Sequence, residues 1–371
     1  RAVLRSSLRE FLASEAMAAL GVPTSRALAM VTSPQPVQRE RTETAAVVTR
    51  TAPSFVRFGH FEHFAHHHQP DALRALVDHV CTDLWPDLGA QYTGAERAAA
   101  MLERVALRSA EMVAQWQALG FCHGVLNTDN MSILGLTLDY GPYQWMEAHQ
   151  PHHICNHSDS SGRYAYDQQP HVVAWNLQAL AVALSAVADT DALVHALHAY
   201  APHYASQLRQ TMARKLGLGA VDEVSTDLIH RWFDLLAQSA ADHTRSHRHL
   251  SEALRDAPDW LSLSTLPHPL MAQLGQDAAV LQWWREAVSR WQTLHPNPAG
   301  LGHALCAINP RFVLRNHMAQ EAISAAEAGD FSLAQTLWEV LQSPYAQHPA
   351  HSDWALMTPA WASRLSVSCS S

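Results

Sequence analysis

A short stretch of the chain, residues 123–142, contains side chains that could support phosphate chemistry. It reads His-Gly-Val-Leu-Asn-Thr-Asp-Asn-Met-Ser-Ile-Leu-Gly-Leu-Thr-Leu-Asp-Tyr-Gly-Pro. Two acids and an amide stand within it, Asp129, Asn130 and Asp139. Their oxygens are ligands that Mg²⁺ or Mn²⁺ takes beside phosphate groups. An Asp-Asn pair is also a common turn former, but the apolar run 133–138 predicts short strands that hold both acids at strand ends.

The spacing matches the catalytic segment of protein kinases, which reads H-R-D-x-x-x-x-N and is followed by D-F-G. His123 takes the His position, Asn130 takes the Asn position, and Asp139 opens a triplet that reads like D-F-G. Val125 stands where kinases have their catalytic Asp, and a valine cannot accept a proton. We therefore interpret Asp129 as the catalytic base for an incoming hydroxyl, with Asn130 and Asp139 as metal ligands.

Composition limits the classes of function. A chain of 371 residues with 48% hydrophobic residues predicts a globular protein with one large or two ordinary domains. Its formal net charge of −9 argues against a nucleic-acid or membrane surface, which would need a basic excess. No signal peptide or membrane helix is visible, and five scattered cysteines form no zinc or secreted-disulfide pattern. We expect a cytoplasmic monomer, or a mitochondrial one in a eukaryote.

The first 70 residues predict a small α/β unit. Apolar residues at helical spacing predict a helix over 4–19 that contains Glu10. Two arginines, Arg50 and Arg57, stand in or beside later strands, and guanidinium groups suit bidentate contact with phosphate. The histidines between 60 and 68 lack the ligand pattern of a zinc site, so we favour no metal role for them. Strands are predicted over 27–31, 45–49 and 54–61, and Pro70 is the candidate hinge.

From residue 71 the chain predicts helices almost throughout. The exception is 143–170, which lacks periodicity and is long enough to suggest an ordered functional loop. The helices are predicted over 71–84, 93–119, 172–188, 191–216, 221–240, 278–294 and 311–341.

Beyond the kinase-like spacing, most of the chain resembles the selenoprotein O/YdiU family. The central run 120–135, with Asp139-Tyr140-Gly141-Pro142, resembles it most specifically. The resemblance implies an α+β, protein-kinase-like fold with two lobes, of a kind also called a pseudokinase. The small mixed α/β lobe would be truncated and cover 1–70, and the large, mainly helical lobe would cover 71–371. Further matches lie at 1–7, 9–12, 50–64, 156–166, 169–170, 175–177, 215–218, 309–311 and 314–316.

The resemblance also implies an activity. Members of this family are protein adenylyltransferases, which move AMP from ATP to Ser, Thr or Tyr hydroxyls of proteins and release pyrophosphate with Mg²⁺ or Mn²⁺. ATP or UTP would be the nucleotide, with Arg50 and Arg57 on the triphosphate. Glu10 would pair with a lysine that precedes Arg1 in the family, together with a glycine-rich segment. Because the chain starts with Arg1 and not Met, we expect a fragment or a processed form.

Two further interpretations remain open at this point. Some relatives carry selenocysteine where Cys369 stands, so Cys369 in the tail could form a reversible redox disulfide with Cys155, or both thiols could stay unlinked. The run 242–245 departs from an aromatic-containing pattern of the family, which concerns local packing more than chemistry. Alternative functions are a kinase that transfers the γ-phosphate and a non-catalytic, nucleotide-binding pseudokinase.

Overall fold

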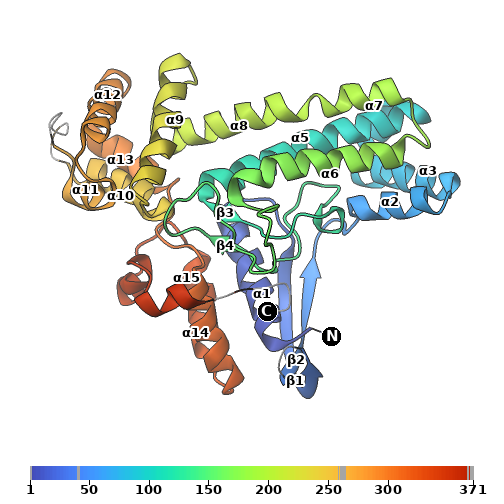
Figure 1. Cartoon of the computed structure of the whole chain (residues 1–371), viewed down its shortest axis with the longest axis horizontal. Coiled ribbons are helices and arrows are strands. Elements are labelled where there is room, and N and C mark those ends of the chain that lie inside the picture. The colour runs from blue at the N-terminus through green and yellow to red at the C-terminus, as the bar shows by residue number, and fades with distance from the viewer. Residues whose placement is uncertain (1, 40–41, 258, 260–264, 366, 368–371) are drawn as a thin grey trace.

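The computed structural model describes residues 2–39, 42–257, 259, 265–365 and 367. Its α+β content is dominated by helices, and its described strands form two small two-stranded sheets. Figure 1 shows a β-hairpin at one side of the molecule and a layer of long helices running across the other side. The predicted α+β class is confirmed.

The N-terminal segment folds as a helix packed on a hairpin. Helix α1 (Leu4–Ala19) buries Leu4, Leu8 and Leu12 on one face, as their helical spacing predicts. Strands β1 (Arg26–Gln38) and β2 (Thr42–Thr51) pair antiparallel. Both strands run beyond their predicted bounds and absorb most of the expected turn between them.

The third predicted strand, 54–61, is wrong, because the structure describes residues 52–57, between β2 and the next helix, and no strand forms among them. Arg57 among them has an extended backbone with a pairing partner, in an isolated bridge with Ser132. Helix α2 (Phe58–His66) then begins, because Phe58 and Phe61 point into the core from one helical face. The His60 ring accepts a hydrogen bond from the Arg57 backbone N–H and so helps to fix the start of this helix.

A long helix delivers the chain to the segment that the sequence singled out. After α3 (Pro70–His79), a π-helical turn (Val80–Leu84) and α4 (Pro86–Gln91), helix α5 runs over Ala95–Leu119. It ends at Gly120, whose φ of 66° is a left-handed helix ending that glycine favours. Strand β3 (Phe121–Cys122) follows and pairs with β4 (Gln144–Trp145), so that residues 123–143 form a closed excursion between the two strands.

The remaining predicted helices are present, but some of them are divided into two. The predicted helix 191–216 breaks at residues 198–199, and the predicted helix 311–341 is extended up to Arg315 and breaks again near Gly329. The short turns η3 (Tyr166–Gln168), η4 (Pro349–Ala355) and η5 (Ala360–Arg364) complete the described chain. The helices are α6 (Gln169–Leu184), α7 (Thr190–Leu197), α8 (Tyr200–Lys215), α9 (Glu223–Gln238), α10 (His243–Arg255), α11 (His268–Leu274), α12 (Ala278–Leu294), α13 (Pro298–Cys306), α14 (Asn316–Glu327) and α15 (Ser332–Leu341).

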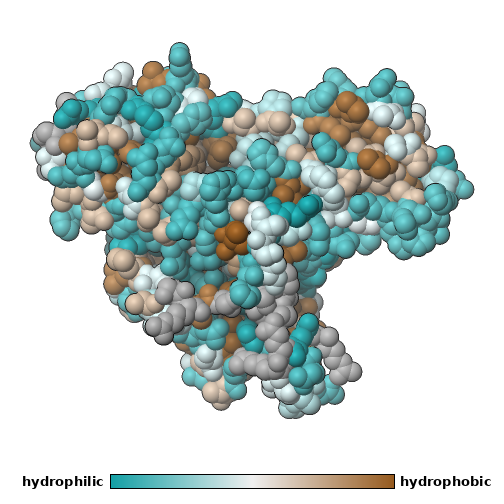
Figure 2. Space-filling view, viewed as in Figure 1, coloured by the Kyte–Doolittle hydropathy of each residue, from teal (hydrophilic) through white to brown (hydrophobic). Residues whose placement is uncertain are grey.

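Two apolar clusters hold these elements together. The larger joins α1, α2, α5, α6, α14 and α15, and the second lies among α8 to α13 and contains four buried tryptophans, Trp232, Trp283, Trp284 and Trp291. The visible surface is mostly hydrophilic, with hydrophobic residues in scattered patches (Figure 2). Within the described ranges no helix combines the length and apolarity that a bilayer crossing requires.

Candidate active site

Two arginines from the hairpin side meet the carboxylate of Asp139. Arg50, near the end of β2, places Nη1 2.6 Å from Oδ1 of Asp139, and Arg57 donates from Nη1 to Oδ2 of the same carboxylate. Burial raises the pKa of Asp139, but the hydrogen bonds from Arg57 and Arg50 outweigh it and hold that pKa below its usual range. Asp139 is therefore ionised, and its carboxylate holds the two guanidinium groups next to each other.

Glu10 extends this cluster from helix α1. Its Oε1 lies 3.1 Å from Nη1 of Arg50, and its Oε2 accepts a hydrogen bond of 2.7 Å from the backbone N–H of Tyr140. Burial raises the pKa of Glu10 more than the charge of Arg50 lowers it. The helix Glu is thus tied to both the arginine and the residue that follows Asp139.

The backbone at Asp139 is held from the opposite side by His123. Asp139 has a φ of 56°, a left-handed conformation that Asp tolerates better than most residues. Nε2 of the fully buried His123 lies 2.8 Å from the carbonyl oxygen of Leu138. Burial lowers the pKa of His123, so the ring is neutral and donates its single N–H to that carbonyl.

Asp129 and Asn130 lie on the short 3₁₀ turn η2 (Thr128–Asn130). The side chain of Asn127 caps this turn by accepting a hydrogen bond of 3.1 Å from the backbone N–H of Asn130. Nδ2 of Asn130 donates to the carbonyl oxygen of Val125 at 3.1 Å, which fixes the amide and leaves its oxygen for other partners. The carbonyl oxygen of Asp129 accepts a hydrogen bond of 2.6 Å from Arg57, so the turn is tied to the arginine cluster.

A cavity of about 490 Å³ brings most of the predicted residues together. Glu10, Arg50, Asn130 and Asp139 all line it, while Arg57 lies behind Asp139 and Asp129 lines a different cavity. An amide oxygen and a carboxylate in one wall fit a hard divalent cation, which prefers oxygen ligands. Because both oxygens of Asp139 already accept hydrogen bonds from the arginines, a cation there would share this carboxylate with them.

Sequence reasoning did not single out several residues that position the site. Arg9 is buried, donates to the carbonyl oxygen of Tyr143 at 3.0 Å and lies over the Tyr143 ring. It also reaches Asn316 on α14, so it ties the segment after Asp139 to two helices. The signal available beforehand was a charged residue on the apolar face of a predicted helix.

Two buried asparagines hold the backbone at the start of segment 123–142. Nδ2 of Asn176, on α6, donates to the carbonyl oxygen of Leu126 at 2.9 Å, and Nδ2 of Asn156 donates to that of Gly124 at 3.1 Å. Both lie within the stretches that carry the family resemblance. A fully buried amide within the apolar run of α6 is itself an indication of such a backbone-holding role.

The predicted redox pair falls partly outside the described residues. Cys369 lies beyond them, whereas Cys155 is buried with Sγ 3.5 Å from the carbonyl oxygen of Cys122. Burial raises the pKa of the Cys155 thiol well above its ordinary value. The tail passes close by, because the backbone N–H of His157 donates to the carbonyl oxygen of Val367 at 2.9 Å.

Comparison with known proteins gives this arrangement a family. The model of the family described as protein adenylyltransferase SelO matches residues 1–342. A protein of Bordetella petrii and one of Variovorax paradoxus, both named protein nucleotidyltransferase YdiU, are 46% identical over the whole of this chain and 74% of their own lengths. A protein of the same name from Cupriavidus metallidurans is 45% identical, and the chain covers 69% of it.

These comparisons place the chain among nucleotidyltransferases. The chain belongs to the SelO family of protein adenylyltransferases. This confirms the resemblance found in the sequence and the predicted enzyme class, a nucleotidyltransferase with AMPylation-type activity.

Proposed function

We propose that this protein transfers AMP from ATP to Ser, Thr or Tyr hydroxyls of other proteins and releases pyrophosphate. The observation that carries this proposal is the cluster of Arg50, Arg57, Asp139 and Glu10 beside the turn that bears Asp129 and Asn130. A two-lobed, kinase-like organisation with its boundary near Pro70 suits this cluster, since its members come from both sides of that boundary. We favour ATP over UTP as the nucleotide, because the family is described as protein adenylyltransferase.

The arginines would bind the phosphates. Arg50 and Arg57 already lie together, partly exposed, at the carboxylate that holds them. Their charge would neutralise the triphosphate and stabilise the departing pyrophosphate in a site of low dielectric. Asn130 and Asp139 would hold Mg²⁺ or Mn²⁺, which supplies charge neutralisation on phosphate oxygens when it is bound.

Asp129 would act as the general base. It would take the proton of the acceptor hydroxyl as the hydroxyl oxygen forms a bond to the α-phosphorus and the bond from that phosphorus to the β-phosphate bridging oxygen breaks. A positioned base of this kind contributes about 10²- to 10⁴-fold to a rate. The exposed side chain of Asp129 is accessible to a macromolecular acceptor.

The Cys155–Cys369 pairing remains a proposal for regulation of the same enzyme. The approach of Val367 to His157 supports it, because it brings the tail to the segment of Cys155. Peptide mapping without reductant, after oxidation, checks it. Recovery of Cys155 and Cys369 as free thiols would contradict the pairing.

The test of the proposed function is label transfer to protein from ATP labelled at the α- or at the γ-phosphate, with Mg²⁺ and with Mn²⁺. The proposal predicts transfer from the α-label only, and its loss in Asp139→Ala. Transfer from the γ-label would instead establish a kinase. Metal-dependent ATP binding without any transfer would establish a non-catalytic pseudokinase.

A further inference from the structure

Consecutive residues of the turn η2 face two separate cavities. Asn130 lines the cavity that also contains Glu10, Arg50 and Asp139. Asp129 lines a second cavity of about 890 Å³, between α2 and α6, and the two cavities share no lining residue. The proposed base thus lines a cavity beside the one proposed for the nucleotide, where an acceptor segment could lie while its hydroxyl reaches the boundary between the two cavities.

One wall of this second cavity is an exposed apolar face of α6, and the wall on the α2 side carries Glu62 and His63. Trp175, Ala179 and Val182 stand at helical spacing along it. The side chains of Trp175 and Val182 are exposed, by 50% and 73%. Large apolar residues exposed together on one helix face are typical of a binding surface, and tryptophan is the residue most enriched among energetically dominant contacts. This apolar face and Asp129 line the same cavity.

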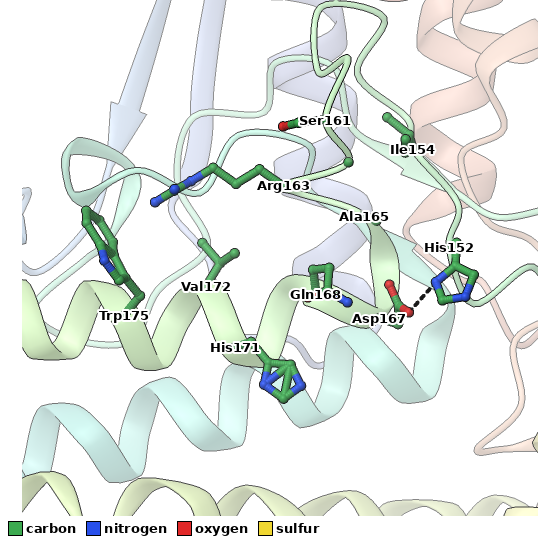
Figure 3. Close-up of a pocket in the computed structure, with 11 residues that line it drawn as sticks. His152, Ile154, Ser161, Arg163, Ala165, Asp167, Gln168, His171, Val172 and Trp175 are labelled. Atoms are coloured by element: carbon green, nitrogen blue, oxygen red, sulfur yellow. Dashed lines mark ion pairs between the residues drawn. The ribbon is translucent and has the colours of Figure 1, made fainter.

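A positive group stands at the far end of the same surface. Trp175 also lines a neighbouring cavity of about 600 Å³, shown in Figure 3, in which Arg163 reaches from the 143–168 loop toward its ring. The guanidinium carbon of Arg163 lies 4.7 Å from the centroid of the Trp175 ring. No ion pair joins Arg163 to a carboxylate within the described part of the chain, and Asp167 in that cavity pairs with His152 at 2.6 Å. An acidic side chain of a partner could therefore form an ion pair with Arg163.

We propose that this surface binds the acceptor protein, and that it selects a hydroxyl residue followed or preceded by an apolar residue and then by an acidic one. The hydroxyl lies at Asp129, the apolar side chain packs on Trp175 and its neighbours on α6, and the acid pairs with Arg163. The inference rests on the proposed function, since it gives that function its acceptor site. It commits to a protein segment because the surface combines an exposed apolar helix face with the guanidinium group of Arg163.

The test uses fluorescein-labelled synthetic peptides with a palindromic sequence, so that either chain direction can bind. The reference peptide has a central Ser flanked on both sides by Leu and then Glu. In the two comparison peptides, Lys replaces Glu or Ala replaces Leu. Affinity is measured by anisotropy without ATP, and transfer of the α-label is measured as kcat and KM for each peptide.

We expect the wild type to prefer the reference peptide. Trp175→Ala should weaken binding of this peptide by about tenfold or more, as truncation of a dominant contact does. Arg163→Glu should reverse the preference toward the Lys peptide, because like charges now face each other with the Glu peptide. ATP affinity should stay unchanged in both variants. Trp361→Ala is the matched control, since Trp361 is 45% exposed and outside both cavities.

The two proposals fail in distinguishable ways. Transfer to the peptides with a KM that neither Trp175→Ala nor Arg163→Glu changes would overturn the acceptor surface and leave the function standing. Binding with the expected preferences, but no AMP transfer to any peptide or protein, would overturn the function and leave the surface standing. A wild type that neither binds the peptides nor distinguishes them in transfer would overturn the surface.

Discussion

At the scale of single residues, Asp139 is the centre of the site. It combines a left-handed backbone with two hydrogen bonds from Arg50 and Arg57 and a depressed pKa. The carboxylate accepts hydrogen bonds from both guanidinium groups and neutralises part of the charge by which they would repel each other. Phosphate oxygens would take over part of this role when ATP binds.

Asp139→Asn separates two roles of the carboxylate, the proposed binding of the metal ion and the binding of the two arginines. The amide keeps the size of the side chain but removes the charge that holds the arginines. We expect AMP transfer to fall by at least about 100-fold, metal-dependent enhancement of ATP binding to disappear, and metal-free ATP binding to stay equal or become tighter. Titration calorimetry with and without Mg²⁺ measures this. Weaker metal-free binding would contradict an arginine–phosphate interaction that competes with Asp139.

Asp129→Asn tests the proposed role of Asp129 as the general base. We expect kcat to fall by about 10²- to 10⁴-fold, the contribution of a general base, while the KM for ATP stays within twofold. Thr128→Ala, in the same turn, is the control and should stay close to the wild type. A large rise in the KM for ATP, with kcat unchanged, would show that Asp129 binds nucleotide instead.

At the scale of elements, the residue pattern predicted most helices and the hairpin because apolar spacing alone defines them. It failed at 54–61, where alternating β-favouring residues precede the helix α2, because packing of Phe58 and Phe61 decides that segment. The residues of the arginine cluster were predictable from motifs of the family. The contact of Arg9 with Asn316 was not, because 307 positions separate them in the chain.

Gly59, on helix α2, leaves space for the carboxylate of Asp129 because glycine has no side chain. A Cβ added at Gly59 would lie 2.1 Å from Oδ1 of Asp129, so Gly59→Ala must displace that carboxylate. Misplacement of a reacting group by about 1 Å costs on the order of 100-fold in rate. We expect such a loss in kcat together with unchanged or higher thermal stability, since alanine favours a helix by up to about 1 kcal/mol over glycine.

The double variant Gly59→Ala with Asp129→Asn is the control for this effect. If Gly59 acts only through Asp129, the double variant should be no slower than Asp129→Asn alone. A further tenfold loss in the double variant would indicate that the substitution disturbs the site by another route.

At the scale of the whole molecule, a chain of buried histidines connects the loop after β4 with helices α5, α9 and α10. Nδ1 of His149 lies 3.0 Å from Nδ1 of His243, and Nε2 of His243 lies 3.1 Å from the carbonyl oxygen of Ala118. Nε1 of Trp232 donates to Nε2 of His247 at 3.0 Å. Nε2 of His243 must donate to the carbonyl oxygen of Ala118, so its Nδ1 accepts from His149, and Nε2 of His247 accepts from Trp232. His243 and His247 therefore each need one nitrogen without a proton and must be neutral. His243 lies in the run 242–245, which departs from the aromatic-containing pattern of the family, and nothing in the sequence indicated this network.

This network predicts that the protein loses stability on mild acidification. Burial lowers the pKa of His149 to about 4, and it lowers the pKa values of His243 and His247 well below their ordinary value. Below pH 6.5 the unfolded chain binds protons that the folded chain cannot, so stability falls from about pH 7 toward pH 4. Each such histidine removes up to about 2 kcal/mol between pH 7 and 5. Lys215, whose pKa burial lowers to about 7, is charged in both states below that pH and adds no slope there.

Urea unfolding at several pH values between 7 and 5 measures this slope. His149→Phe is the comparison, because its ring lies beside Tyr166 and Phe233 and an aromatic replacement keeps that packing. We expect the variant to be less stable at pH 7, through loss of one hydrogen bond, but to lose less stability on acidification. An equal slope in both proteins would show that His149 does not carry the effect.

The most direct test of the central claim is a product balance after incubation with ATP, Mg²⁺ and an acceptor protein. Chromatography of the nucleotides and intact-mass spectrometry of the acceptor are done on the same sample. We expect one pyrophosphate to be released for each AMP gained by the acceptor, and neither product to form with Asp139→Ala. ADP released together with a phosphorylated acceptor would contradict it, because the γ-phosphate would then face the acceptor.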